Sequence, residues 1–84
     1  MTQEDIFQQL TNIFRDLFED DTIVLTNTTN QSDIAEWDSM SHVNLMVMVE
    51  SHFDIKFRTA EIEDMKNVGD LVASIAQKMA ARNR

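Results

Sequence analysis

The side chains most able to take part in chemistry are a serine and two histidines. They lie in and just beyond the stretch EWDSMSHVNLMVMVE, residues 36–50. Ser39 follows Asp38 where a polar segment gives way to a helical pattern, which predicts that Asp38 caps a helix and Ser39 is its first residue. The first amides of a helix are unpaired and its dipole end is positive, so an anion attached to Ser39 would be stabilised there. The residue types by themselves favour a simpler interpretation, in which Ser39 only helps to cap the helix.

A serine nucleophile needs a neighbouring base, and the only candidates are His42 and His52. His52 lies at the far end of the same helix. His42 is three residues from Ser39 but falls on the core side, where we expect it to pack under the preceding loop. No glycine-rich turn supplies an oxyanion hole. We therefore predict that the protein is not a hydrolase and has no catalytic residues.

Metal centres are also not expected. The chain has no Cys and only two His, which makes a structural zinc site improbable. Four carboxylates follow one another closely, without the spacing of an EF-hand loop: Asp16, Glu19, Asp20 and Asp21. We interpret them as a solvated acidic helix end.

The elements that must position Ser39 can be read from the apolar periodicity, which is helical in three long segments and one short one. The first helix is predicted over residues 3–18, with Thr2 and Asp5 in a capping-box arrangement. The second runs over about residues 39–52. Residues 59–65 form one or two turns, with Thr59 as the cap and two apolar residues facing inward, Ile62 and Met65. The last helix follows Asn67, with Asp70 three residues later.

These patterns predict an all-α four-helix bundle with three main helices, a short third helix and a long loop between the first two. The loop carries an apolar island at residues 23–25, and Ile34 and Trp37 anchor its far end, so we expect it to be ordered. The 84 residues suffice for one domain, which we place at 1–84. With 43% hydrophobic residues, one Gly and no Pro, the chain is too apolar for a disordered protein and favours helices.

The net charge of −8 disfavours nucleic acid and anionic membranes as partners, and favours proteins with basic patches. No apolar run is long enough to span a bilayer. The N-terminal segment MTQEDIFQQL lacks the basic start of a secretion signal. We expect a cytoplasmic monomer.

The helix over residues 39–52 has two apolar faces at about 100° per residue. The core stripe consists of Leu45, Met46, Val49 and Phe53, with His42 beside it. Met40 and Val47 stand among polar residues on the opposite face, and Glu50 borders that face. Scattered exposed apolar residues are ordinary. The alternative is a strip that docks partners, for which an adaptable Met is well suited.

The segment WDSM followed by HVNLMVMVESHFDIKF resembles an acyl carrier protein. That family opens its second helix with Asp-Ser-Leu or Asp-Ser-Met, here Asp38, Ser39 and Met40. The exit of that helix in the family, E-x-x-F-x-I, resembles the segment ESHFDI. The family's first loop resembles DDTIVLTNTTNQSDIAEWDS. The start of its last helix resembles KNVGDLVASI. The resemblance covers nearly the whole chain.

The resemblance implies a four-helix bundle that carries cargo without catalysis of its own. A phosphopantetheinyl transferase would move 4′-phosphopantetheine from coenzyme A onto Ser39, beside the motif acid Asp38. The thiol of that arm would carry acyl groups as thioesters between acyl-loading and acyl-transferring enzymes. Met40, Val47 and Glu50 match positions that such carriers offer to partner enzymes.

Departures from the family pattern favour a dedicated carrier for a specialised pathway, such as a polyketide, modified lipid, cell-wall or amino-acid-derived product. The second helix has neutral or basic residues where acids are frequent: His42, Asn44, Ser51 and His52. Lys56 and Arg58 make its exit basic, and Trp37 replaces a small residue. The alternative from another class is an unmodified acidic module that binds a basic protein through this helix.

Overall fold

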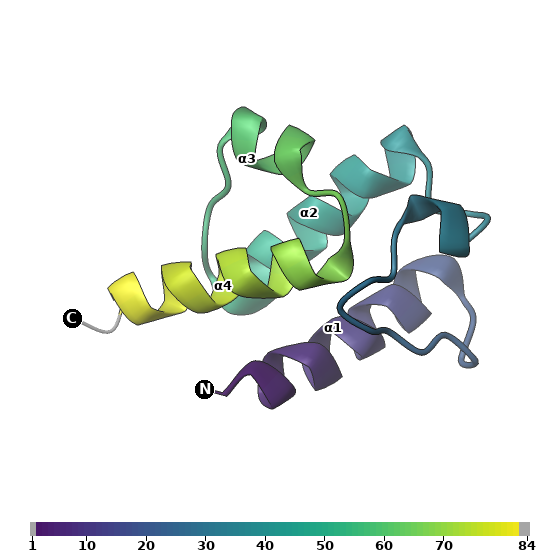
Figure 1. Ribbon diagram of the computed structural model, residues 1–84, viewed down its shortest axis with the longest axis horizontal. Helices are drawn as coiled ribbons and strands as arrows, with labels where there is room; N and C mark the ends of the chain where they lie inside the picture. The colour runs from purple at the N-terminus through teal and green to yellow at the C-terminus, as the bar shows by residue number, and fades with distance from the viewer. Residues whose placement is uncertain (1, 83–84) are drawn as a thin grey trace.

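The structure is a computed structural model that describes residues 2–82, and within them it contains four α-helices and one 3₁₀ turn (Figure 1). The elements are α1 (Gln3–Phe18), the 3₁₀ turn η1 (Gln31–Asp33), α2 (Ser39–Phe53), α3 (Thr59–Asp64) and α4 (Val68–Arg82). The predicted all-α bundle with a short third helix is confirmed. None of the helices in this range is both long and apolar enough to cross a membrane.

Helix α1 starts and ends as its sequence dictates. The Thr2 hydroxyl accepts the N–H of Asp5 at 3.2 Å and the Asp5 carboxylate accepts the N–H of Thr2 at 3.1 Å, which confirms the capping box. The helix ends at Glu19 in a left-handed conformation, with φ of 50°. Its apolar face packs against α2 and α4, and these three helices share one core.

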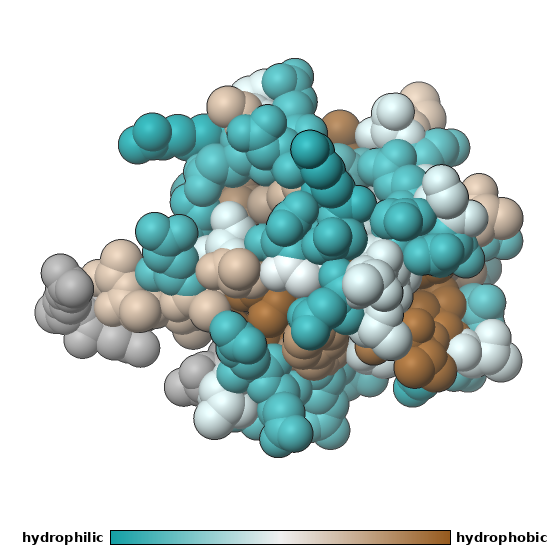
Figure 2. Space-filling model, in the orientation of Figure 1, coloured by the Kyte–Doolittle hydropathy of each residue, from teal (hydrophilic) through white to brown (hydrophobic). Residues whose placement is uncertain are grey.

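The core consists of fifteen buried hydrophobic residues among those the structure describes: Ile6, Leu10, Ile13, Phe14, Ile23, Trp37, Leu45, Met46, Val49, Phe53, Ile55, Val68, Leu71, Val72 and Ile75. They come from α1, α2, α4 and the connections between them. The surface in Figure 2 is mainly hydrophilic, with apolar areas between α1 and α4 and over the loop that follows α1.

The loop between α1 and α2 is tied down near its start and in its middle. Arg15 donates from Nε to the carbonyl of Ile23 at 2.9 Å, and Ile23 is buried as the predicted apolar island requires. The loop backbone then reaches α4, where the N–H of Val68 donates to Thr29 O at 2.8 Å and that of Gly69 to Asn27 O at 2.9 Å. These bonds hold the segment that leads to Trp37 and Ser39.

Gly69 is the single glycine of the chain, and the close approach of the loop explains it. A Cβ at this position would lie 2.7 Å from the Asn27 carbonyl oxygen, which is too short for a carbon–oxygen contact. The sequence pattern alone offered no reason for a glycine near the start of the last helix, because the partner lies about forty residues away.

The 3₁₀ turn was not expected. Its first turn is closed because Asn30 accepts the N–H of Ser32 at 2.9 Å and Asp33 accepts the N–H of Asn30 at 3.0 Å. The pair of Asn30 and Asp33 three residues later is a capping signal that could have predicted it.

Helix α3 has its N-cap one residue earlier than predicted. Arg58, rather than Thr59, is the N-cap residue, because the Glu61 carboxylate accepts the N–H of Arg58 at 2.8 Å. The prediction of Thr59 as the cap is therefore wrong. Ile62 and Met65 are half-buried, as expected for the inward side of this helix.

Candidate functional site

Ser39 is the first residue of α2 and is exposed. Asp38 is the N-cap: its carboxylate accepts the N–H of Ser41 at 2.8 Å, and its carbonyl accepts the N–H of His42 at 2.9 Å. The Ser41 amide, followed by the Ser41 hydroxyl, holds the pKa of the Asp38 carboxyl below its usual value. The predicted cap is confirmed, and it keeps a charged carboxylate next to an exposed hydroxyl at the positive end of a helix.

His42 is buried and cannot act as a base for Ser39, because both ring nitrogens are engaged. Trp37 donates from Nε1 to His42 Nδ1 at 3.2 Å, and His42 Nε2 lies 3.1 Å from the carbonyl oxygen of Ile62. Both contacts are hydrogen bonds only if the ring is neutral with its proton on Nε2. Trp37 in turn packs edge-on against Phe14 of α1, with ring centroids 5.0 Å apart.

The prediction that His42 packs under the loop is thus confirmed. Sequence reasoning missed its hydrogen bonds, which join the loop, α2 and α3. The available signal was weak: a Trp and a His five residues apart, across a predicted helix start.

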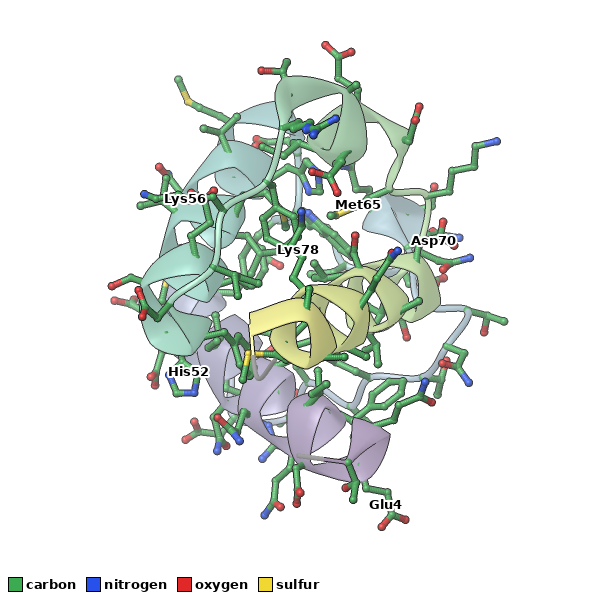
Figure 3. All side chains as sticks on the ribbon, turned by 90° about the vertical axis from the view of Figure 1, so that its left-hand side faces the viewer. Glu4, His52, Lys56, Met65, Asp70 and Lys78 are labelled. Carbon is green, nitrogen blue, oxygen red and sulfur yellow. The ribbon has the colours of Figure 1, made fainter. Side chains whose placement is uncertain are left out.

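His52 is also remote from Ser39. It is exposed near the end of α2 (Figure 3), where it forms a hydrogen bond with Gln9 of α1. Neither histidine is therefore placed to activate the serine.

The two faces predicted for α2 are confirmed by burial. His42, Leu45, Met46, Val49 and Phe53 are buried. Met40 is 78% exposed and Val47 58% exposed, and Val43 is likewise exposed at 56%. We call Met40, Val43 and Val47 the exposed strip. Single exposed apolar residues are common, but these three are spaced three and four residues apart, which makes them neighbours on the surface of the helix that Ser39 begins.

Glu50 has a structural task that the sequence did not indicate. Its carboxylate accepts the N–H of Phe57 at 2.7 Å, and its carbonyl accepts the N–H groups of Asp54 and Ile55, the latter at 3.1 Å. The residue is half-buried at the border of the exposed strip. Glu50 thus ends α2 and fixes the direction in which the chain leaves it.

A cleft of about 380 Å³ opens beside Ser39 between η1, α2 and α3. It is lined by Gln31, Ser39, His42, Val43, Ile62, Glu63 and Met65. Within residues 2–82, no group of three or more His, Cys, Asp or Glu side chains is arranged to hold a metal ion.

Comparison with known proteins identifies the family of this chain. A family model described as "Phosphopantetheine attachment site" matches residues 8–75. An acyl carrier protein of Lactobacillus acidophilus is 32% identical over 75 residues, which are 89% of this chain and 94% of that protein. The chain belongs to the acyl carrier protein family.

Other acyl carrier proteins agree with this assignment. That of Thermotoga maritima is 30% identical over 78 residues, 93% of this chain and 96% of the relative. The solution NMR structure of a holo acyl carrier protein from Geobacter metallireducens is 49% identical, with a TM-score of 0.86, over 90% of this chain and 87% of that one.

Acyl carrier proteins hold their cargo on a covalent 4′-phosphopantetheine and have no catalytic activity of their own. The family match and the holo neighbour therefore confirm two expectations for this chain: a phosphopantetheine cofactor and a carrier role rather than an enzymatic one.

Proposed function

We propose that Ser39 is the residue to which the 4′-phosphopantetheine of this acyl carrier protein is attached. The observation that carries the proposal is an exposed serine at the first position of α2. The first amides of a helix favour a phosphodiester at this position. The exposed hydroxyl and the cleft beside it leave room for the group.

The side chains around Ser39 have supporting tasks. Asp38 fixes the start of α2 and keeps Ser39 at the helix end. The arm supplies the thiol that carries acyl groups as thioesters, and the chain itself contains no Cys that could compete. His42, closed off by its two hydrogen bonds, takes no part in the chemistry.

We propose that partner enzymes dock on the exposed strip. Met40 and Val47 would fill apolar pockets of the partner, and Glu50 would lie at the border while it holds the Phe57 amide. The partners are a phosphopantetheinyl transferase and the enzymes that load and receive the acyl group. Their basic patches would meet exposed acids near the strip, such as Glu63, which lines the same cleft as Val43.

The pathway is proposed to be a specialised one rather than the supply of ordinary fatty acids. The first turn of α2 contains no acidic residue, and Lys56 and Arg58 are exposed where the chain leaves α2. A partner selected for this surface would need fewer basic residues opposite α2 than a partner of a strongly acidic carrier. Residues 1–84 would act as one monomeric carrier domain in the cytoplasm, with no role in binding nucleic acid.

Co-expression with a broad-specificity phosphopantetheinyl transferase, followed by intact-mass measurement, tests the attachment site. The wild type should gain the mass of one phosphopantetheine. Ser39→Ala should gain nothing, whereas Ser41→Ala, a matched change two residues away, should still be modified. A gain that survives Ser39→Ala would refute the proposal, and so would an unmodified wild type.

A further inference from the structure

Helix α3 is held to the rest of the molecule by few contacts. It has no fully buried residue, and its inward side consists of Ile62 and the adjoining Met65, both half-buried. At one side, Glu61 forms an ion pair with Lys78 of α4 at 3.0 Å, and Figure 3 shows Lys78 pointing from α4 toward α3. This ion pair is partly exposed and contributes little to stability. Among the residues that the structure describes, the other polar tie of α3 to a neighbouring helix is the hydrogen bond between His42 and the carbonyl of Ile62.

That hydrogen bond belongs to a buried chain of contacts that crosses the molecule. Phe14 of α1 contacts Trp37, Trp37 donates to His42 of α2, and His42 donates to Ile62 of α3. Trp37 is 5% exposed and His42 8% exposed. Each ring nitrogen of His42 has one hydrogen-bond partner, so both nitrogens are paired only while α3 stays in place.

The two residues that form this tie also form a wall of the cleft beside Ser39. His42 and Ile62 both line it, whereas its lining includes no residue of α1 or α4. Leu45 and Met46 follow His42 on the buried side of α2 and belong to the core. An acyl chain that left this cleft for the core between α2 and α3 would pass the point where His42 joins the two helices.

We propose that His42 is a specificity-determining latch that keeps cargo out of the bundle core, so that this carrier suits short or polar acyl groups and not long hydrocarbon chains. This inference rests on the proposed attachment at Ser39. Separating α3 from α2 to admit a hydrocarbon breaks the bond to Ile62 and leaves a polar ring nitrogen against an apolar chain. A short or polar group needs no such opening, because it can remain in the cleft or in solvent.

The test compares two forms of the protein, one with an acetyl group and one with an octanoyl group on the arm. Each form is made when a phosphopantetheinyl transferase moves the acylated arm from the matching acyl-coenzyme A onto the unmodified protein. Loading at Ser39 is first verified by intact mass. For the wild type, the melting temperature of the octanoyl form should exceed that of the acetyl form by less than about 1 °C. In His42→Ala the octanoyl form should gain about 4 °C or more, since the chain can then enter the core. His42→Gln, whose amide can still donate to the Ile62 carbonyl, should behave as the wild type, and so should His52→Ala.

The difference between acyl forms is the informative readout, because a purely structural role of His42 would lower both melting temperatures equally. A measurement on the wild type needs no variant that might fail to fold. Trp37 is the only tryptophan, so its indole N–H gives one NMR signal, and this signal should be unchanged between the acetyl and octanoyl forms.

A large acyl-dependent gain or a shifted indole signal in the wild type would overturn the latch. Equal behaviour of a folded His42→Ala and the wild type would overturn it as well. Failure to load Ser39 would be recognised separately by mass, and would remove the proposed function together with this inference.

Discussion

Val47 and Val49 offer a matched test of the two faces of α2. They are the same residue type, two positions apart on one helix, but Val47 is 58% exposed and Val49 is fully buried. An Asp at each position introduces the same charge and the same loss of apolar surface. Any difference between the variants must therefore come from where the two side chains lie.

The expected magnitudes differ widely. Val49→Asp loses about 1.5–3 kcal/mol of apolar burial and adds an unpaired carboxylate to the core, which costs several kcal/mol more. That sum is comparable to the total stability expected for a chain of this size, which is about 4–13 kcal/mol at roughly 0.05–0.15 kcal/mol per residue. Val47→Asp, on the surface, should change the free energy of unfolding by no more than about 0.5 kcal/mol.

Two assays separate folding from docking. Circular dichroism with urea titration should show a folded Val47→Asp and a largely unfolded Val49→Asp. The rate of phosphopantetheine transfer at limiting carrier concentration should fall about tenfold in Val47→Asp, which corresponds to the loss of an interface contact worth about 1.4 kcal/mol. Comparable unfolding of the two variants would refute the two-face assignment. A folded Val47→Asp that is modified and loaded at the wild-type rate would refute the docking strip.

Two further predictions concern the frame around the site. Gly69→Ala should lower the melting temperature by about 4–8 °C, because crowding against Asn27 O costs about 2 kcal/mol and the better helix propensity of Ala restores only about 1 kcal/mol. Ala73→Gly, an exposed position of α4, measures that propensity term separately, and an unchanged or raised melting temperature in Gly69→Ala would contradict the close approach. The pKa of Asp38 is lowered on folding, so its ionised form stabilises the protein above the usual pKa, and this contribution is lost as the pH falls below about 4. The Asn of Asp38→Asn still caps the helix, so the urea midpoint of this variant should stay near the wild-type value at pH 7. From pH 5 to 3 its urea midpoint should fall less steeply than that of the wild type. An equally steep fall in both proteins would contradict the stabilising role of the ionised Asp38.

The helices themselves were predictable because their signals are local. Apolar residues at helical spacing and side chains that cap their own helix, such as Thr2 and Asp38, act over three or four residues. The error at Thr59 has the same local origin: Glu61 reaches back to the amide of Arg58, a pairing that the sequence contains but that competes with the obvious Thr cap. The position of Ser39 at the head of α2 followed from these signals, and the family resemblance supplied its chemical meaning.

The contacts that shape the site were not predictable, because they join residues far apart in the sequence. The Ile62 carbonyl accepts a hydrogen bond from His42, twenty residues away, and Gly69 contacts Asn27 across half the length of the chain. Glu50 was expected to face partners, yet its carboxylate also closes the exit of its own helix on Phe57. The periodic pattern specifies which side of each helix is apolar, whereas the packing of those sides against one another determines which polar atoms meet, because a hydrogen bond depends on the relative placement of two elements to within a fraction of an ångström.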